Sequence, residues 1–277
     1  MSGILFRAKT QEAYVFKILA EVLSNNIKTG CFVVDKDGIS LCMMDSHKTV
    51  LLNLKLESEN FSIYKFNSSK KLYLGLNLSH LLKMVKSIKK KDQLELFIEE
   101  ANPSDLCIKV IPKENNRTTT SYIKIQSIQN LDIDIPTGYQ KPIIVSSSDY
   151  QKMVKEMSTI GNVIKVTSSN YKIEFSCNTG GIFKRKVTFG EEEDDEDKSS
   201  KSDENECEFS QEFLTDTLCK ITKLAGLGSN IQIYTGKPLL LVSKIGTLGK
   251  ISAYIKSKEQ IEAENYSNTL ESDYDSD

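Results

Sequence analysis

The order of helices and strands that the first half of the sequence predicts recurs in the second half. In the first half, the helical segments are Thr10–Ser24 and Asn77–Lys91, and strands follow each of them. In the second half, Ser148–Thr159 and Gln211–Leu224 take the same places. A repeated order indicates a duplicated domain, and 277 residues are enough for two medium domains. The predicted strands are Cys31–Val34, Ile39–Met44, Thr49–Leu56, Ser62–Phe66, Gln93–Glu99, Asp105–Ile111, Thr120–Ile125, Asn162–Val166, Lys172–Cys177, Phe183–Phe189, Asn230–Tyr234, Leu239–Lys244 and Gly249–Ile255.

The connections between the predicted strands are too short for a parallel βαβ architecture, which favours antiparallel sheets with helices packed on one face. The sequence therefore predicts an α+β fold of two similar domains. We expect the first domain over residues 1–125, an interdomain connector over 126–141 and the second domain over 142–256. An acidic loop over 190–208 interrupts the second domain, and the acidic tail over 257–277 is expected to be disordered.

Acidic residues are concentrated in two short segments. Glu191–Glu208 holds eleven acidic residues against two lysines, and Glu259–Asp277 holds seven acidic residues and no basic one. Because the net charge of the whole chain is −2, the remainder carries about +14. A basic folded body indicates a nucleic-acid partner. On charge alone, a lysine-rich surface with no such partner stays an alternative.

Each of the four predicted helices places lysines opposite its apolar stripe. On the first helix, Ala13 and Ala20 fall on the same face as Lys17. One such face is usually a solvated surface, but four in matched positions indicate a surface that can surround a polyanion. The lysines on these faces are Lys17, Lys83, Lys86, Lys90, Lys152, Lys155, Lys220 and Lys223. No recognition helix or aromatic platform accompanies them, so we expect them to neutralise phosphates of a nucleic acid without sequence preference.

Catalysis, metal binding and membrane insertion find no support in the sequence. There is no P-loop or paired-carboxylate motif on an ordered element, only two histidines, and no CxxC pair among the six cysteines. We therefore predict no enzyme activity, no metal site and no cofactor. The longest apolar run, Pro238–Val242, is too short to span a membrane, and Met1–Lys9 lacks the apolar core of a secretory signal. A soluble intracellular protein is expected.

Five segments, in order and with similar spacing, resemble the proliferating cell nuclear antigen family of sliding clamps, over roughly Ile4 to Lys256. They are GISLCMMDSHKTVLLNLKL (Gly38–Leu56), LYLGLNLSHLLKMVK (Leu72–Lys86), DIPTGY (Asp134–Tyr139), STIGNVIKV (Ser158–Val166) and KPLLLVSKIGTLGKISAYI (Lys237–Ile255). The resemblance implies the DNA-clamp fold, in which the antiparallel sheets of both domains lie outside and their helices lie inside. It also implies that three chains close head-to-tail into a ring.

The resemblance gives the lysines a place on the inner wall of that ring. By motif alignment, basic positions of the family's inner wall fall on Lys17, Lys83, Lys86, Lys152, Lys155 and Lys223. Lys90 and Lys220 are added from the helical pattern alone. The resemblance implies a non-enzymatic processivity factor that encircles double-stranded DNA without sequence preference and tethers DNA polymerase and repair proteins. It also implies that a clamp loader opens the ring and that the protein acts in the nucleus or a viral replication compartment.

The family also has an apolar pocket under the connector, into which partners insert an aliphatic residue and two aromatic residues. The residues that match this pocket are Met44, Leu51, Ile133, Ile135, Pro136, Pro238 and Tyr254. Without the resemblance, each of them reads as ordinary core or loop packing.

Ring closure in this family pairs the strand near Thr118–Ile125 with the strand near Ile182–Phe189 of the next chain. Here the second strand carries Lys184, Arg185 and Lys186, and the first offers no matching acidic residues. A monomer or a subunit of a mixed ring, such as a checkpoint clamp, therefore stays an alternative to the closed homotrimer.

Overall fold

The computed structural model describes residues 3–114, 117–169, 172–190 and 209–274, with side chains to residue 267. The predicted acidic loop over 190–208 lies, apart from Gly190, outside the described residues. None of the described helices combines the length and the apolar character of a membrane span.

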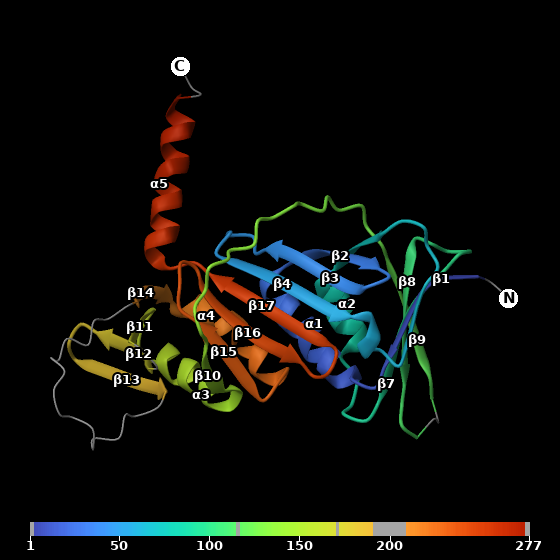
Figure 1. Ribbon diagram of the computed structural model, residues 1–277, viewed down its shortest axis with the longest axis horizontal. Helices are drawn as coiled ribbons and strands as arrows, with labels where there is room; N and C mark the ends of the chain where they lie inside the picture. The colour runs from blue at the N-terminus through green and yellow to red at the C-terminus, as the bar shows by residue number, and fades with distance from the viewer. Residues whose placement is uncertain (1–2, 115–116, 170–171, 191–208, 275–277) are drawn as a thin grey trace.

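The two halves of the chain contain elements in closely similar order (Figure 1). The first half contains β1 (Ile4–Thr10), α1 (Ala13–Asn26), β2 (Thr29–Asp35), β3 (Gly38–Met44), β4 (Val50–Glu57), the 3-10 turn η1 (Ser58–Asn60), β5 (Ile63–Phe66), β6 (Leu72–Asn77), α2 (Leu78–Val85), β7 (Gln93–Glu99), β8 (Asp105–Ile111) and β9 (Thr119–Lys124). The second half contains β10 (Ile143–Ser146), α3 (Ser147–Ser158), β11 (Val163–Ser169), β12 (Lys172–Thr179), β13 (Phe183–Gly190), β14 (Phe209–Leu214), α4 (Thr215–Ile221), the 3-10 turn η3 (Thr222–Gly226), β15 (Asn230–Tyr234), β16 (Leu239–Ile245), β17 (Gly249–Ile255) and α5 (Lys258–Tyr274).

The strands in the described residues form three antiparallel sheets, and the largest sheet crosses the boundary between the halves. Sheet β5-β1-β7-β8-β9 belongs to the first half, and sheet β13-β12-β11-β14 belongs to the second. The order of the large sheet is β10-β15-β16-β17-β4-β3-β2-β6, so β17 and β4 join the halves. Their ladder runs without a break from Gly249 opposite Leu56 to Ile255 opposite Val50.

The duplication explains why β17 and β4 meet. By order and sheet position, β17 corresponds to β9, and β4 corresponds to β13. The strands that join the halves, β17 and β4, are therefore the repeat counterparts of β9 and β13. These two strands stand at the outer edges of the small sheets. In Figure 1, β9 and β13 lie at opposite ends of the molecule.

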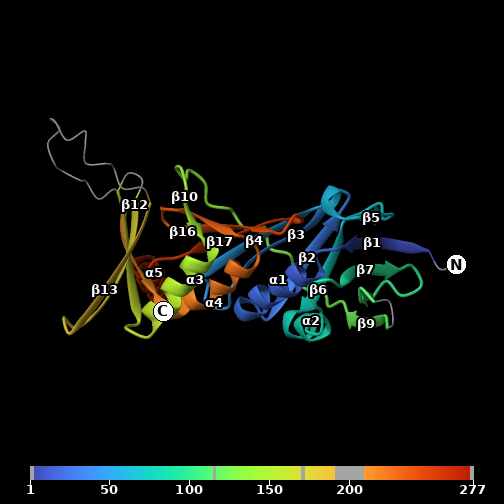
Figure 2. The ribbon, with the colours of Figure 1, turned by 90° about the horizontal axis from the view of Figure 1, so that it is seen from below.

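Helices α1 to α4 lie in one layer on the same side of the large sheet (Figure 2). Their apolar side chains are buried against the sheets, including Leu19 at 1% and Val154 and Leu218 at 0% exposure. The first helix is buried on more than its apolar stripe, since Ala13 and Ala20 are also buried. This corrects their expected position on the solvent face. Besides the sheets, α1 packs against α2, α4 and η3, so more than one of its faces is covered.

Gln211–Leu214 and the acidic tail differ from their predicted structure. Gln211–Leu214 is not helical but belongs to β14, because this alternating stretch pairs with β11 and buries Phe213. The tail is not disordered over its described part, since Lys258–Tyr274 forms α5. A reciprocal capping box begins this helix: Gln260 N donates to Ser257 Oγ at 3.2 Å, and Ser257 N donates to Gln260 Oε1 at 3.0 Å.

Candidate nucleic-acid interface and outer apolar cluster

Five of the eight predicted lysines stand on the helix layer with free ammonium groups. They are exposed, and none of them forms an ion pair with a residue that the structure describes. They are Lys83 on α2, Lys86 at its C-cap, Lys152 and Lys155 on α3, and Lys220 on α4. These residues carry positive charge on the one face of the molecule that consists of helices. That they contact DNA stays a prediction.

Lys17 is held in place by its neighbours. Its side chain is half-buried, and Nζ donates a hydrogen bond of 3.1 Å to the carbonyl of Ile88. The same ammonium lies 5.6 Å from the ring centroid of Tyr14, within cation–π distance. Lys17 therefore joins α1 to the segment after α2, and less of its charge is open to a ligand.

Lys223 of the second half forms an ion pair with a residue of the first half. Its Nζ lies 2.9 Å from Glu21 Oε1, so η3 is paired with α1. The two side chains are 47% and 34% exposed, and such pairs contribute only about 0.2–1 kcal/mol to stability. The carboxylate nevertheless offsets the charge that Lys223 offers to a polyanion.

Lys90 is not on the face of α2, which corrects its predicted placement. The helix ends at Val85, because Ile88 N bonds back to Val85 O and tightens the chain into a turn. Asp92 closes this turn by accepting a hydrogen bond of 2.9 Å from Lys89 N. Lys90 is exposed in that turn, with Nζ 6.0 Å from the ring centroid of Tyr14.

Glu156 and Asp216 are further acidic residues near the helix face. Glu156 pairs with Arg185 of β13 at 2.9 Å, so its charge is offset. Asp216 is exposed in the first turn of α4, where the helix dipole stabilises an acidic side chain. The lysine face is therefore positive but not free of acid.

A small apolar cluster lies on the opposite, outer face of the large sheet, separate from the main core. Its buried members are Leu51, Leu240 and Tyr254, and Met44 and Ile133 pack against them. Four of the seven predicted pocket residues are therefore brought together: Met44, Leu51, Ile133 and Tyr254.

The remaining three predicted pocket residues lie at the edge of this cluster or outside it. Ile135 is 41% exposed on the connector, and Pro136 is half-buried beside it. Pro238 follows a cis peptide bond and contributes its carbonyl, which accepts a hydrogen bond of 2.8 Å from Tyr139 Oη. Their place in a partner site stays a prediction.

Tyr139 fastens the connector to the outer face. Besides its bond to Pro238, its ring lies 6.1 Å from the ring centroids of both Tyr234 and Tyr254. Burial, and to a lesser degree the neighbouring Tyr254, raises the pKa of Tyr139 to about 12. Its hydroxyl therefore keeps its proton and donates at neutral pH.

The sequence alone did not identify Cys42, Tyr139, Tyr234, Leu240 and Val242 as members of this cluster. For Leu240 and Val242, the two-residue alternation of side chains along β16 is the feature of the sequence that could have identified them. Leu240 and Val242 point outward while Leu239 and Leu241 point into the core, but the run Pro238–Val242 is apolar throughout and hides the alternation.

Asp45 shapes the loop beside the cluster. The carboxylate is 7% exposed and accepts hydrogen bonds from Thr49 N at 2.6 Å, Val50 N at 2.8 Å and Thr49 Oγ1 at 3.0 Å. These bonds close the turn between β3 and β4 and set the positions of Met44 and Leu51 on either side of it.

The edges of the small sheets expose apolar side chains. Tyr122 on β9 is 64% exposed, and Phe183 on β13 and the adjacent Ile182 are 52% and 91% exposed. Two of the three cations on β13 are paired within the chain, since Arg185 meets Glu156 and Lys186 lies 2.8 Å from Glu174. The expected surplus of positive charge on this strand is thus reduced largely to Lys184.

Comparisons with known proteins agree with this geometry. Two family models match the chain: "Proliferating cell nuclear antigen, N-terminal domain" over residues 5–135 and "Proliferating cell nuclear antigen, C-terminal domain" over residues 134–269. A protein named probable DNA polymerase sliding clamp 1, from Paramecium bursaria Chlorella virus 1, is 24% identical over 260 residues, which are 91% of this chain and 97% of that protein. The proliferating cell nuclear antigen of Dictyostelium discoideum is 26% identical over 262 residues, 92% and 99% of the two chains.

The fold is also that of a solved structure. The crystal structure of proliferating cellular nuclear antigen from Entamoeba histolytica superposes with a TM-score of 0.77 at 22% identity, covering 92% of this chain and all of that one. The α+β fold of two similar domains with antiparallel sheets is thereby confirmed.

Proposed function

The chain belongs to the proliferating cell nuclear antigen family and is a DNA sliding clamp, and from this premise we propose that three copies close head-to-tail into a ring around duplex DNA. In this proposal, the layer of α1 to α4 forms the inner wall and the sheets form the outside.

The observation that carries the ring is the internal junction between β17 and β4. The chain already joins one domain to the next through this strand pair, and its counterparts β9 and β13 are open at opposite ends. Two exposed edges pair readily through backbone hydrogen bonds. Repeating the internal junction between chains therefore generates a head-to-tail contact, and such contacts form rings when the rotation closes.

The charges on β13 do not oppose this contact. Arg185 and Lys186 are already paired with Glu156 and Glu174, and Ile182, Phe183 and Tyr122 supply apolar surface that the contact would bury. A closed homotrimer is therefore favoured over the monomer and the mixed ring.

The lysines of the helix layer would neutralise phosphates on the inner wall without reading the sequence. Contacts of this kind are weak and sensitive to salt. In a closed ring, topology keeps the protein on the duplex, and the lysines need only let it slide.

The outer apolar cluster is proposed as the site for DNA polymerase and other partners that carry a clamp-binding motif. Met44, Leu51, Ile133 and Tyr254 would receive the apolar side chains of the motif, beside a connector held by Tyr139. We further propose that the protein acts without catalysing a reaction, that a clamp loader opens the ring, and that it works in a nucleus or a viral replication compartment.

The inner wall is tested by reversing the charge of Lys83, Lys86, Lys152 and Lys155. The expected result is a marked loss of clamp-stimulated DNA synthesis, while light scattering still gives the mass of three chains. A control variant reverses three lysines exposed on the outer face of the large sheet, Lys55, Lys244 and Lys250, and should keep stimulation. Unchanged synthesis by the first variant would show that the inner-wall assignment is wrong.

A further inference from the structure

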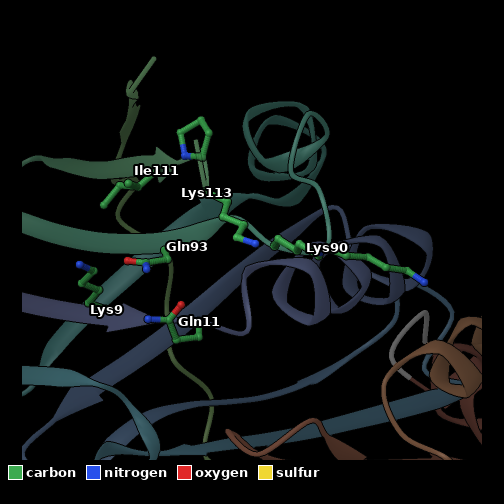
Figure 3. A pocket seen from close by; sticks show the side chains of 8 residues that line it. Lys9, Gln11, Lys90, Gln93, Ile111 and Lys113 are labelled. Carbon is green, nitrogen blue, oxygen red and sulfur yellow. The ribbon is translucent and has the colours of Figure 1, made fainter. Parts of the chain in front are cut away.

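A basic cleft opens at one end of the sheet of the first domain, beside the start of α1. Its volume is about 690 Å³. The residues that line it are Lys9, Gln11, Lys90, Lys91, Gln93, Ile111, Pro112 and Lys113. Figure 3 shows Lys9, Gln11, Gln93 and Lys113 set around this space, with Ile111 on the side of β8. None of these lining residues is acidic.

The topology of the sheet brings these lysines together. β1, β7 and β8 are neighbours, with Thr10 opposite Leu94 and Gln93 opposite Ile111. The end of β1, the start of β7 and the end of β8 therefore meet at one edge. Each of these chain segments brings lysine to that edge.

Glu114, next to Lys113, is exposed but does not line the cleft, and three other carboxylates near in sequence are engaged elsewhere. Glu95 is buried and lies 2.6 Å from Arg7, and Asp92 is buried and accepts from Lys89 N. Glu12 reaches the other half of the chain, where Thr247 Oγ1 donates to it at 3.3 Å. None of the four cleft lysines forms an ion pair with a residue in the described part of the chain. No acidic residue within the cleft lining offsets their mutual repulsion, which favours an anionic ligand.

The cleft is continuous with the lysine face of the helices. Lys90 lines the cleft, and its Nζ lies 6.0 Å from the ring centroid of Tyr14. Lys17 of α1 approaches the same ring at 5.6 Å. Positive charge thus runs from α1 past Tyr14 into the cleft, which places the cleft at the rim of the proposed inner wall.

We propose that this cleft binds backbone phosphates of the duplex where it leaves the ring. Its volume is that of a ligand site, about 300–1,000 Å³, but a lining that includes four lysines disfavours an apolar ligand and suits a polyanion. Gln11 and Gln93 add amide donors for phosphate oxygens. This proposal rests on the proposed encirclement of DNA and adds a contact outside the helix faces. Such a contact would hold the duplex tilted toward the first domain.

The test uses the full chain and a fluorescent DNA duplex, titrated over a series of salt concentrations. The cleft variant combines Lys9→Gln, Lys91→Gln and Lys113→Gln, and leaves Lys90 in place. Its matched control combines Lys55→Gln, Lys244→Gln and Lys250→Gln, which removes the same charge from the outer face. A third variant, Lys83→Gln with Lys86→Gln, reports on the inner wall. Thermal unfolding and assembly mass show that each variant is folded and assembled.

The expected result is severalfold weaker duplex binding by the cleft variant. The slope of log K against log salt should fall by about 1 for each phosphate that the variant no longer neutralises. The outer-face control should bind as the wild type does. Normal binding by the cleft variant alongside weakened binding by the Lys83/Lys86 variant would overturn this inference and leave the proposed function standing. Equally weakened binding by the cleft and outer-face variants would also overturn it, because the loss of affinity would then follow from the change in net charge alone.

A parallel titration with inorganic phosphate distinguishes the DNA backbone from a free anion. If the cleft variant loses protection by inorganic phosphate against thermal unfolding but keeps its affinity for the duplex, the cleft is a small-anion site and the DNA contact is refuted.

Discussion

Tyr254 of β17 lies directly opposite Leu51 of β4 in the antiparallel ladder that joins the two halves of the chain. Both side chains point outward into the outer apolar cluster. The proposed partner site therefore stands on the junction between the domains, and neither half supplies it alone. The same strand pair, repeated between chains, is the proposed contact of the ring.

Met44 and Met43 offer a matched pair for testing the partner site. Met44 packs into the outer cluster, whereas its neighbour Met43 points through the sheet toward the main core. Met44→Ala should weaken binding of a peptide with one aliphatic and two aromatic anchors about fivefold, or by about 1 kcal/mol, because half-buried apolar area is removed. Met43→Ala should lower thermal stability and leave the affinity unchanged. Calorimetric titration measures both affinities, and equal affinities for the two variants would place the peptide elsewhere.

Tyr122 tests the edge of the ring. It is 64% exposed on β9, where the proposed contact would bury it. Tyr122→Ala should weaken assembly about 10- to 100-fold, the equivalent of about 1.5–3 kcal/mol of apolar burial. Tyr73→Ala removes a tyrosine of similar exposure, 52%, from β6 and should leave assembly intact. Dilution followed by light scattering gives both dissociation constants, and an unaffected Tyr122→Ala assembly would exclude β9 from the interface.

We expect the docking of the connector onto the outer apolar cluster to depend on pH in the alkaline range, because Tyr139 holds the connector there. Its pKa is raised to about 12 when docked, whereas a free tyrosine has a pKa of about 10. Docking is therefore independent of pH below about 10 and is lost as the pH rises toward 12, because the undocked state binds fewer protons there. Hydrogen exchange of the connector should increase over this window, and Tyr139→Phe should remove the dependence. Ionisation of Tyr139 near its ordinary pKa, seen in the difference absorbance between these two proteins, would contradict the docked position.

The capping box of Ser257 and Gln260 is expected to stabilise the first turn of α5. Ser257→Ala removes one bond of the capping box and should destabilise the first turn by about 1 kcal/mol. Hydrogen exchange of the amides in residues 258–262 should then rise about fivefold, since 1.4 kcal/mol corresponds to tenfold. Ser267→Ala is the control, because Ser267 Oγ donates only to Ala263 O within the helix. Equal exchange in both variants would mean that the capping box does not hold this end.

Much of the fold follows from periodicity, since the predicted strands overlap those of the structure along both halves. The differences have local causes. β1 escapes prediction because Arg7 and Lys9 lie between the buried Phe6, Ala8 and Thr10 and disguise a half-buried strand. β14 is predicted as the start of a helix because its pairing with β11, which lies far away in sequence, cannot be read from the local sequence. The acidic composition of the tail favours disorder and outweighs the capping signal of Ser257 and Gln260.

The site is less predictable than the fold. The helical period correctly places lysines on regular helices, such as Lys83 and Lys152. It misplaces Lys90 because the helix ends five residues before it, where Asp92 closes a turn. The partners of Lys223 and Lys17 come from elements distant in sequence, Glu21 and Ile88, and only the packing of the helix layer reveals them.

The most direct test of the proposed ring is topological. Protein assembled on a labelled DNA circle and washed at high salt, which removes contacts made by charge alone, should stay with the circle. Cutting the circle once should release it, because a closed ring slides off a free end. Equal retention on circular and cut DNA, or equal release from both, would contradict a ring that encircles the duplex.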